Sequence, residues 1–284
     1  MKTRIASTTK EVIIGDGPTV LIGERINPSG RQKLIESLKA GSMDLVRKEA
    51  IDQVKAGADI IDVNVTVFGT DEVKLLAQAV KTVNEAVETP ICIDSSNIDA
   101  LEAALKIATG KPLVNSVTGE ERSLSRVLPL IKEFGVSVVG LLQDDQGIPH
   151  DVERRVAIAH HIVERAAKYG IPPENIILDC MAFAVGAEPS SGRSVLGAIA
   201  RIKAELGVNM TMGLSNMSFG MPDRSTVNNA FVSMAIAAGA TCFIVDAARI
   251  RPAILAADLL LEKDRHARRY IQAFRSRQAE KPQA

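Results

Sequence analysis

The sequence predicts a single (β/α)8 TIM barrel of the α/β class, and three observations lead to this prediction. Eight short apolar segments rich in β-branched residues alternate with segments of helical periodicity. The apolar segments are continuous, which is typical of parallel strands buried on both faces. Eight such strand–helix pairs within residues 20–277 form the pattern of a TIM barrel.

The predicted elements follow in order along the chain. The strands cover 20–26, 60–65, 91–96, 113–117, 136–143, 176–179, 209–216 and 242–247. The helices cover 44–56, 71–87, 97–108, 123–134, 151–168, 192–206, 225–238, 252–262 and 264–277. Asp71 suits the start of its helix, and Gly57 suits the end of the helix before it.

No linker, repeat or low-complexity stretch divides the chain. We expect an N-terminal arm at 1–19, which could form a hairpin that closes the bottom of the barrel. The barrel follows at 20–277, and a flexible tail at 278–284. An open doubly wound sheet is the alternative, but its glycine-rich first turn is missing, because the chain has neither GxGxxG nor GxxxxGK[ST].

Composition excludes several classes of function. Lys plus Arg and Asp plus Glu each number 34 in 284 residues, so no charge excess points to a nucleic acid or a membrane surface. No apolar run reaches the length of a membrane span or resembles a secretory signal, so we expect a soluble cytoplasmic protein. No His or Cys spacing matches a metal site, so no metal ligand is predicted.

Polar residues follow nearly every predicted strand, where a buried strand should be apolar. Each has a structural explanation by itself: Ser96 or Asn97 could cap the next helix, and Asp62 could pair with Arg25. A whole ring of buried carboxylates and amides is costly unless it has partners, so it predicts a polar ligand. The ring comprises Glu24, Arg25, Asn27, Asp62, Asn64, Asp94, Ser95, Ser96, Asn97, Asn115, Ser116, Gln143, Asp144, Asp145, Asp179, Ser215, Asn216 and Asp246.

The residue types in this ring describe the ligand. Arg25 is its only Arg and it contains no Lys, whereas a phosphate site favours basic residues. Carboxylates accept hydrogen bonds from N–H groups, and amides both donate and accept. A planar heterocycle with an amino-pyrimidinone edge fits this set, although sugars and amino acids fit it as well.

Six motifs occur in order at the spacing of barrel strands: GERIN (23–27), DVNV (62–65), CIDSSN (92–97), VNS (114–116), ILD (177–179) and GLSNMS (213–218). Together they resemble the pterin-binding methyltransferase family over about residues 20–275. That family includes methyltetrahydrofolate:corrinoid protein methyltransferases and the folate domain of cobalamin-dependent methionine synthase. The resemblance implies methyl transfer, in either direction, between methyltetrahydrofolate and the cobalt of a corrinoid protein.

The resemblance also implies site residues. It places Asp94 and Asp179 at the pyrimidine edge of the pterin and Asn216, as the catalytic residue, at the methyl-bearing ring nitrogen. The full set of pterin contacts is Asp94, Asn115, Asp144, Asp179, Asn216 and Arg224. Cobalamin would come from a partner corrinoid protein, because the chain lacks a DxHxxG-like segment, and the NPSGRQK loop at 27–33 could select that partner. Family members are often homodimers, which the Ala-rich helices at 225–238 and 252–262 could support.

Two other functions remain open. A dihydropteroate synthase shares the pterin pocket, but its chemistry uses a serine-rich loop after the first strand, a Lys near the seventh strand and an Arg-x-His pair near the eighth. None of these is present. The chain could also be a pterin-binding subunit without turnover, in which case substitution of Asn216 would change affinity more than rate.

Overall fold

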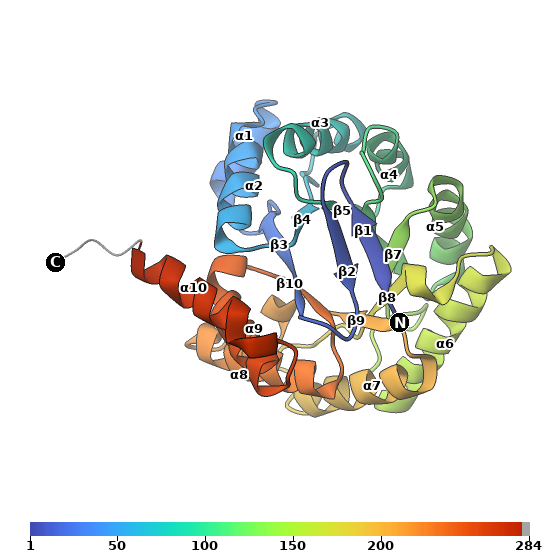
Figure 1. The fold of residues 1–284 in the computed structure, drawn as a ribbon. Coiled ribbons are helices and arrows are strands. Elements are labelled where there is room, and N and C mark those ends of the chain that lie inside the picture. Colours follow the sequence, from blue (N-terminus) through green and yellow to red (C-terminus); the bar gives the residue numbers. More distant parts are fainter. Residues whose placement is uncertain (280–284) are drawn as a thin grey trace.

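Eight parallel strands form the predicted barrel, and helices surround it (Figure 1). The computed structural model describes residues 1–279. The strands are β3 (Val20–Ile26), β4 (Ile60–Val63), β5 (Ile91–Asp94), β6 (Leu113–Thr118), β7 (Ser137–Leu141), β8 (Ile176–Asp179), β9 (Asn209–Thr211) and β10 (Cys242–Val245). They pair in chain order and β10 returns to β3, while a parallel bridge between Gly213 and Ile244 joins the β9 and β10 sides.

The predicted helices are present, with small shifts at their ends. They are α2 (Asp44–Ala56), α3 (Glu72–Ala86), α4 (Ile98–Leu105), α5 (Glu121–Phe134), α6 (Val152–Lys168), α7 (Ser191–Leu206), α8 (Arg224–Ala238), α9 (Ala247–Leu260) and α10 (Arg268–Ala279). Three caps are confirmed. Asp71 accepts a hydrogen bond from the Lys74 amide, Asn97 accepts one from the Asp99 amide, and Gly57 has a φ of 95°.

Two predictions about loops and strands are wrong. The segment 27–33 is not all loop, because α1 (Gln32–Lys39) begins within it and buries Leu34 and Leu38 against the barrel. The seventh strand ends at Thr211 rather than at 216. Residues Leu214–Asn216 form a short 3-10 helix, η2, so the chain turns back over the end of the barrel there.

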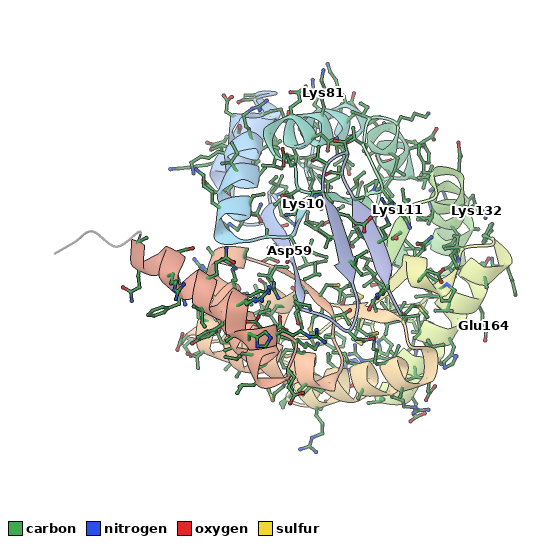
Figure 2. The ribbon with its side chains drawn as sticks, in the orientation of Figure 1. Lys10, Asp59, Lys81, Lys111, Lys132 and Glu164 are labelled. Atoms are coloured by element: carbon green, nitrogen blue, oxygen red, sulfur yellow. The ribbon has the colours of Figure 1, made fainter. Side chains whose placement is uncertain are left out.

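The first residues form a hairpin across the N-terminal end of the barrel (Figure 1). Strands β1 (Thr3–Ala6) and β2 (Glu11–Ile14) pair antiparallel, and Ile5 and Ile14 are fully buried among the lower side chains of the barrel strands. The Asn209 amide donates to Thr3 Oγ1 at 2.9 Å and to the Ile14 carbonyl at 3.0 Å. Ala6 bridges to Lys111, which lies beside the hairpin in Figure 2. The N-terminal segment therefore covers the bottom of the barrel.

The chain ends with a helix on the outside of the barrel. α10 packs on α9, buries Ala273 and pairs Arg269 with the buried Asp258 at 3.0 Å. It includes residues 278 and 279 of the expected tail, whereas 280–284 lie outside the described residues. Within residues 1–279, no helix is both long enough and apolar enough to cross a membrane.

Candidate active site

Two neighbouring strands bring Asp94 and Asn115 together at the C-terminal end of the barrel. Asp94 ends β5 and lies opposite Asn115 of β6 in the strand register. Asn64, which follows β4, donates from its side-chain amide to Asp94 at 3.0 Å. Parallel strands place their carboxyl ends at one edge, so three polar residues far apart in sequence form one polar floor.

Asp62 lies below this floor and does not pair with Arg25, so that interpretation was wrong. Asp62 is fully buried in β4, beside Asn115, and its Oδ1 has no hydrogen-bond partner. Arg25 instead points to Glu49 and Asp246, at 4.0 and 3.9 Å. Burial, together with the charge of Asp94, holds the pKa of Asp62 well above its ordinary value.

Asp179 forms a second polar point across the barrel mouth, at the end of β8. It is buried and accepts hydrogen bonds from the backbone N–H of Met181, at 2.7 Å, and from that of Gly213. Gly213 opens the turn that leads to Asn216. The carboxylate thus links the end of β8 to the segment after β9.

Asn216 sits in η2, on a segment that is held from two sides. Ser215 donates to Glu24 of β3 at 2.9 Å. Arg224, the first residue of α8, donates to the Ser215 carbonyl at 2.6 Å and to Ser218 Oγ at 3.1 Å. The Asn216 side chain is exposed. In this structure Arg224 holds the segment that presents Asn216, and a direct contact of Arg224 with the ligand stays a prediction.

Asp144 lies in the loop after β7 and is already engaged. Arg154 of α6 forms an ion pair with its carboxylate, and the Gln146 amide donates to it at 2.9 Å. These hydrogen bonds lower the pKa of Asp144 despite the opposing effect of its partial burial. Among the described contacts, none joins Asp144 to the other expected site residues, so its role in the site stays a prediction.

The carboxylates of the site share an unusual electrostatic environment. Burial raises the pKa of Asp94 to about 6, a hydrogen bond from Asn64 lowers it, and the charge of Glu72 raises it further. Burial likewise raises the pKa of Asp179 to about 6, against the hydrogen bonds from Met181 and Gly213. Groups with such shifts often belong to functional sites. Ligand N–H groups that hydrogen-bond to these carboxylates would favour their charged forms.

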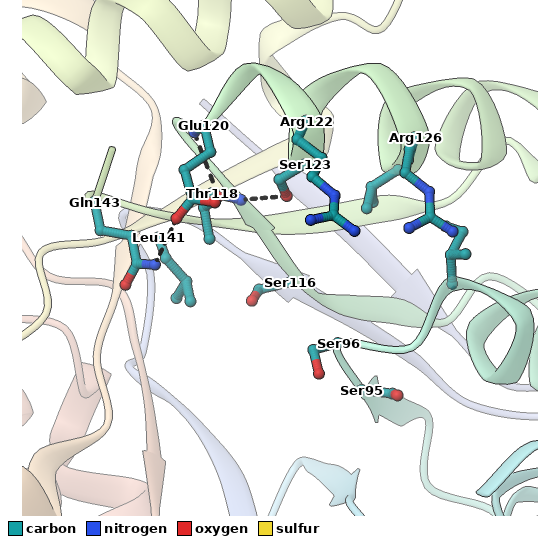
Figure 3. Close-up of a pocket in the computed structure, with 12 residues that line it drawn as sticks. Ser95, Ser96, Ser116, Thr118, Glu120, Arg122, Ser123, Arg126, Leu141 and Gln143 are labelled. Carbon is teal, nitrogen blue, oxygen red and sulfur yellow. Dashed lines mark hydrogen bonds between the residues drawn. The ribbon is translucent and has the colours of Figure 1, made fainter. Parts of the chain in front are cut away.

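A cavity of about 420 Å³ adjoins the polar floor (Figure 3). Ser95 and Ser116, which directly follow Asp94 and Asn115, line it. Arg122 and Arg126 of α5 line another side, and Figure 3 shows both side chains extending from this helix.

The family described as "Pterin binding enzyme" matches residues 23–246, from the first barrel strand to just past the last. The chain belongs to the pterin-binding enzymes. This membership confirms the resemblance drawn from the six motifs.

Two relatives of this pterin-binding enzyme extend the comparison. The methylcorrinoid:tetrahydrofolate methyltransferase of Eubacterium limosum is 34% identical over 264 residues, which cover 90% of this chain and 96% of that protein. The methionine synthase of Mycobacterium leprae (strain TN) is 32% identical over 265 residues, which cover 87% of this chain and 22% of that protein. This chain therefore spans about a fifth of the methionine synthase.

Solved structures confirm the barrel. Dihydropteroate synthase from Thermus thermophilus, in complex with 6HMPPP, has a TM-score of 0.68 at 22% identity and covers 90% of this chain and 99% of its own. The Yersinia pestis DHPS with a pterine-sulfa conjugate has a TM-score of 0.71 at 17% identity, covering 92% and 100%. At these identities the likeness establishes the fold alone.

Some residues of this pterin-binding enzyme's site could not be found from the sequence. Glu72, in the first turn of α3, accepts a hydrogen bond from Ser95 and raises the pKa of Asp94. Arg155 of α6 is fully buried and donates to the Met181 carbonyl at 2.6 Å, beside Asp179. Both residues lie at the start of a helix. An acid in the first turn, such as Glu72, or a base at the end of the first turn, such as Arg155, does not differ in sequence from a solvent-exposed charge. Only the three-dimensional packing places them at the site.

Proposed function

We propose that this enzyme transfers a methyl group between the N5 nitrogen of tetrahydrofolate and the cobalt of a corrinoid protein. The observation that carries the proposal is the arrangement at the barrel mouth. Asp94 and Asn115 belong to the polar floor, and Asp179 lies across the barrel mouth from them. Asn216 is exposed on the turn that Glu24 and Arg224 hold. The full-length relative from Eubacterium limosum is named for this chemistry.

The floor suits the pyrimidine edge of a pterin. That edge presents N–H groups, and ionised Asp94 and Asp179 can accept hydrogen bonds from them. The side-chain amide of Asn115 can both donate and accept, which suits a position where the edge offers a donor next to an acceptor. Charged hydrogen bonds of this kind are the stronger ones, and the buried setting increases their effect. We propose secondary roles for Asp144 and Arg224. The carboxylate of Asp144 is already ion-paired, and the guanidinium of Arg224 already donates to the η2 segment.

Asn216 would act at the ring nitrogen. Methyl transfer changes the charge on N5 in either direction. N5 takes the methyl group from the methylcorrinoid and then loses its proton, and in the reverse reaction it is a poor leaving group unless it is protonated or strongly hydrogen-bonded. An amide has no acidic proton to give, but it can hydrogen-bond the state in which charge develops and orient a water molecule. Glu24 accepts from the Ser215 hydroxyl, and Arg224 donates to the Ser215 carbonyl and to Ser218 Oγ, so the residues on both sides of Asn216 are held and its movement is limited.

Cobalamin would be carried by a separate protein and would supply the cobalt that gives or takes the methyl group. The residues of this chain would bind and orient the folate, so no nucleophile from the chain is required. We propose the direction from methylcorrinoid to tetrahydrofolate, because the relative that matches 90% of the chain is named for that direction.

A dihydropteroate synthase reaction is the weaker alternative. The solved synthases resemble this chain at no more than 22% identity, which supports a shared fold only. The polar residues of the segment after β9 include Ser215 and Asn216 but no Lys, and the start of α9 after Asp246 contains no His. A binding subunit without turnover is separated from an enzyme by the experiment below.

The deciding experiment mixes the anaerobic protein with cob(I)alamin and methyltetrahydrofolate, and then with methylcobalamin and tetrahydrofolate, and follows the cobalt absorbance. We expect protein-dependent transfer that falls sharply in Asn216→Ala and stays normal in Asn84→Ala, a matched substitution on α3. Folate binding without transfer to free cobalamin or to a corrinoid protein would favour a binding subunit. Absence of folate binding would contradict the proposal.

We also propose that two copies associate, and that the enzyme works in the cytoplasm. The outer surfaces of α8 and α9 leave Met234 and Leu260 exposed, at 49% and 82%. Exposed apolar side chains on neighbouring helices suit a contact between copies. Light scattering on the purified protein tests this, and replacing both residues with Ser should shift the mass toward that of a monomer.

A further inference from the structure

Two arginines on one face of α5 have no acidic partner in their own helix. Arg122 and Arg126 are four residues apart, so their side chains are neighbours and their charges repel. The residues three and four positions away from either arginine include no Asp or Glu. The nearest acids are engaged elsewhere, because Glu121 pairs with Arg165 and Glu120 accepts a hydrogen bond from Gln143 at 3.1 Å.

These arginines face a cavity and not only open solvent. They line the 420 Å³ cavity, where hydroxyl groups of Ser96 and Ser116 lie across from them (Figure 3). Glu120 is the one acidic residue among the twelve that Figure 3 draws around it. Paired guanidinium groups with nearby hydroxyls form a site that favours an anion such as a carboxylate or a phosphate.

The folate is not the natural source of this anion. If the pyrimidine edge rests on Asp94, Asn115 and Asp179, the tail of the folate leaves from the opposite end of the pterin, next to N5 and Asn216. Asn216 follows β9, whereas the cavity adjoins β5 to β7, and these strands are not neighbours in the barrel. The tail carboxylates would therefore point away from α5.

We propose that Arg122 and Arg126 form a docking site for carboxylates on the surface of the corrinoid protein. This inference rests on the proposed function, because the cobalt can reach N5 only if its carrier protein covers the C-terminal end of the barrel. α5 begins directly after β6 at that end, so its first two turns lie at the rim of the covered surface. Rim charges of this kind accelerate and orient association, and salt weakens their effect.

The test compares two methyl acceptors in one assay. Free cob(I)alamin has no protein surface, whereas a corrinoid protein that the wild-type enzyme methylates has one. In the double variant Arg122→Glu/Arg126→Glu we expect unchanged transfer to free cob(I)alamin and a kcat/KM for the corrinoid protein at least ~10-fold lower at low salt. The matched control is Arg265→Glu/Arg275→Glu, in and beside α10, which Figure 1 shows on a different side of the barrel from α5.

Inorganic phosphate is the second probe. At constant ionic strength, phosphate should slow transfer to the corrinoid protein by the wild-type enzyme and leave the double variant unaffected. The inference is overturned if the double variant serves the corrinoid protein as well as the wild type does. It is also overturned if transfer to free cob(I)alamin falls equally, because the arginines would then act on the folate or the reaction itself. If the wild-type enzyme methylates neither acceptor and binds no folate, the proposed function is what fails.

Discussion

The two ends of the barrel differ in the side chains that they enclose, which are mainly apolar at the N-terminal end and include several carboxylates at the C-terminal end. At the N-terminal end, Ile5 and Ile14 of the hairpin pack against apolar side chains of the strands, and the Asn209 amide nitrogen donates to Thr3 and to the Ile14 carbonyl, although the Asn209 amide oxygen has no partner. At the C-terminal end, the buried carboxylate of Asp62 lies close to the partly buried carboxylate of Asp94, and Asp62 also has an oxygen without a partner.

The difference separates stability from function. Burial of apolar surface stabilises the lower end, whereas crowded buried carboxylates at the upper end cost stability that only a ligand can recover. Substitutions at the lower end should therefore change the free energy of unfolding, and substitutions at the upper end should change ligand binding and rate. The following predictions test this division, in order of decreasing expected effect.

The largest effect is expected from Ile14→Ala in the hairpin. Ile14 is fully buried, so its truncation leaves a cavity and should lower the free energy of unfolding by about 2–5 kcal/mol. Urea denaturation measures this change. The methyl-transfer rate of the folded fraction should stay close to that of the wild type, and a large loss of rate would show that the two ends are coupled.

Asn216→Ala should lower the transfer rate by about 100-fold, because one hydrogen bond to the reacting nitrogen is lost. The exposed side chain contributes little to folding, so the melting temperature should not change. Single-turnover kinetics and calorimetry separate rate from folate affinity. An equal loss of both would assign Asn216 to binding only.

Asp179→Asn should weaken folate binding by about 30-fold, because a charged hydrogen bond to the pterin is replaced by a neutral one. The amide oxygen can still accept from the Met181 N–H, so stability should hold or improve. Calorimetric titration with methyltetrahydrofolate provides the affinity. Asp99→Asn, on the exposed surface of α4, is the matched control.

Stability and folate affinity should change with pH in opposite directions. Asp94 and Asp179 have pKa values raised to about 6, so between about pH 4 and 6 the folded chain holds more protons than the unfolded chain. Their contribution to stability is therefore present below pH 4 and is lost as the pH rises through 6. Folate affinity should increase over the same interval, since the charged carboxylates accept the N–H groups. Parallel thermal melts and titrations across this interval and just above it, from about pH 4 to 7, would reveal opposite slopes.

Asp144→Asn should have the smallest effect, about threefold on folate affinity, because Arg154 and the Gln146 amide already occupy its carboxylate. The titration used for Asp179 measures it. A loss as large as that of Asp179→Asn would mean that Asp144 leaves Arg154 and contacts the ligand directly.

The sequence predicted the barrel because its strands are apolar runs and because caps such as Asn97 and Gly57 act within a few residues of their own position. It could not predict that Arg25 turns toward Glu49 instead of Asp62, since barrel packing decides that choice. The start of α1 was hidden in a segment rich in Pro, Ser and Gly.

The same limit applies to the candidate site. Residues that directly end strands, such as Asp94 and Asp179, were visible because a polar residue after an apolar run is unexpected. Glu72 and Arg155 lie in the first turns of α3 and α6, where the sequence alone does not separate them from solvent-exposed charges. Their proximity to the strand ends depends on how each helix folds back, which no local pattern records.

The hairpin also bears on how the chain is made. Asn209 donates to Thr3 and Ile14, and β10 pairs with β3, so the first segments find their last partners only after most of the chain has been synthesised. Until then an apolar hairpin face and an open strand edge remain uncovered on the nascent chain, a state prone to aggregation. Ribosome-bound fragments that stop before Asn209 should therefore depend on chaperones far more than the completed chain does.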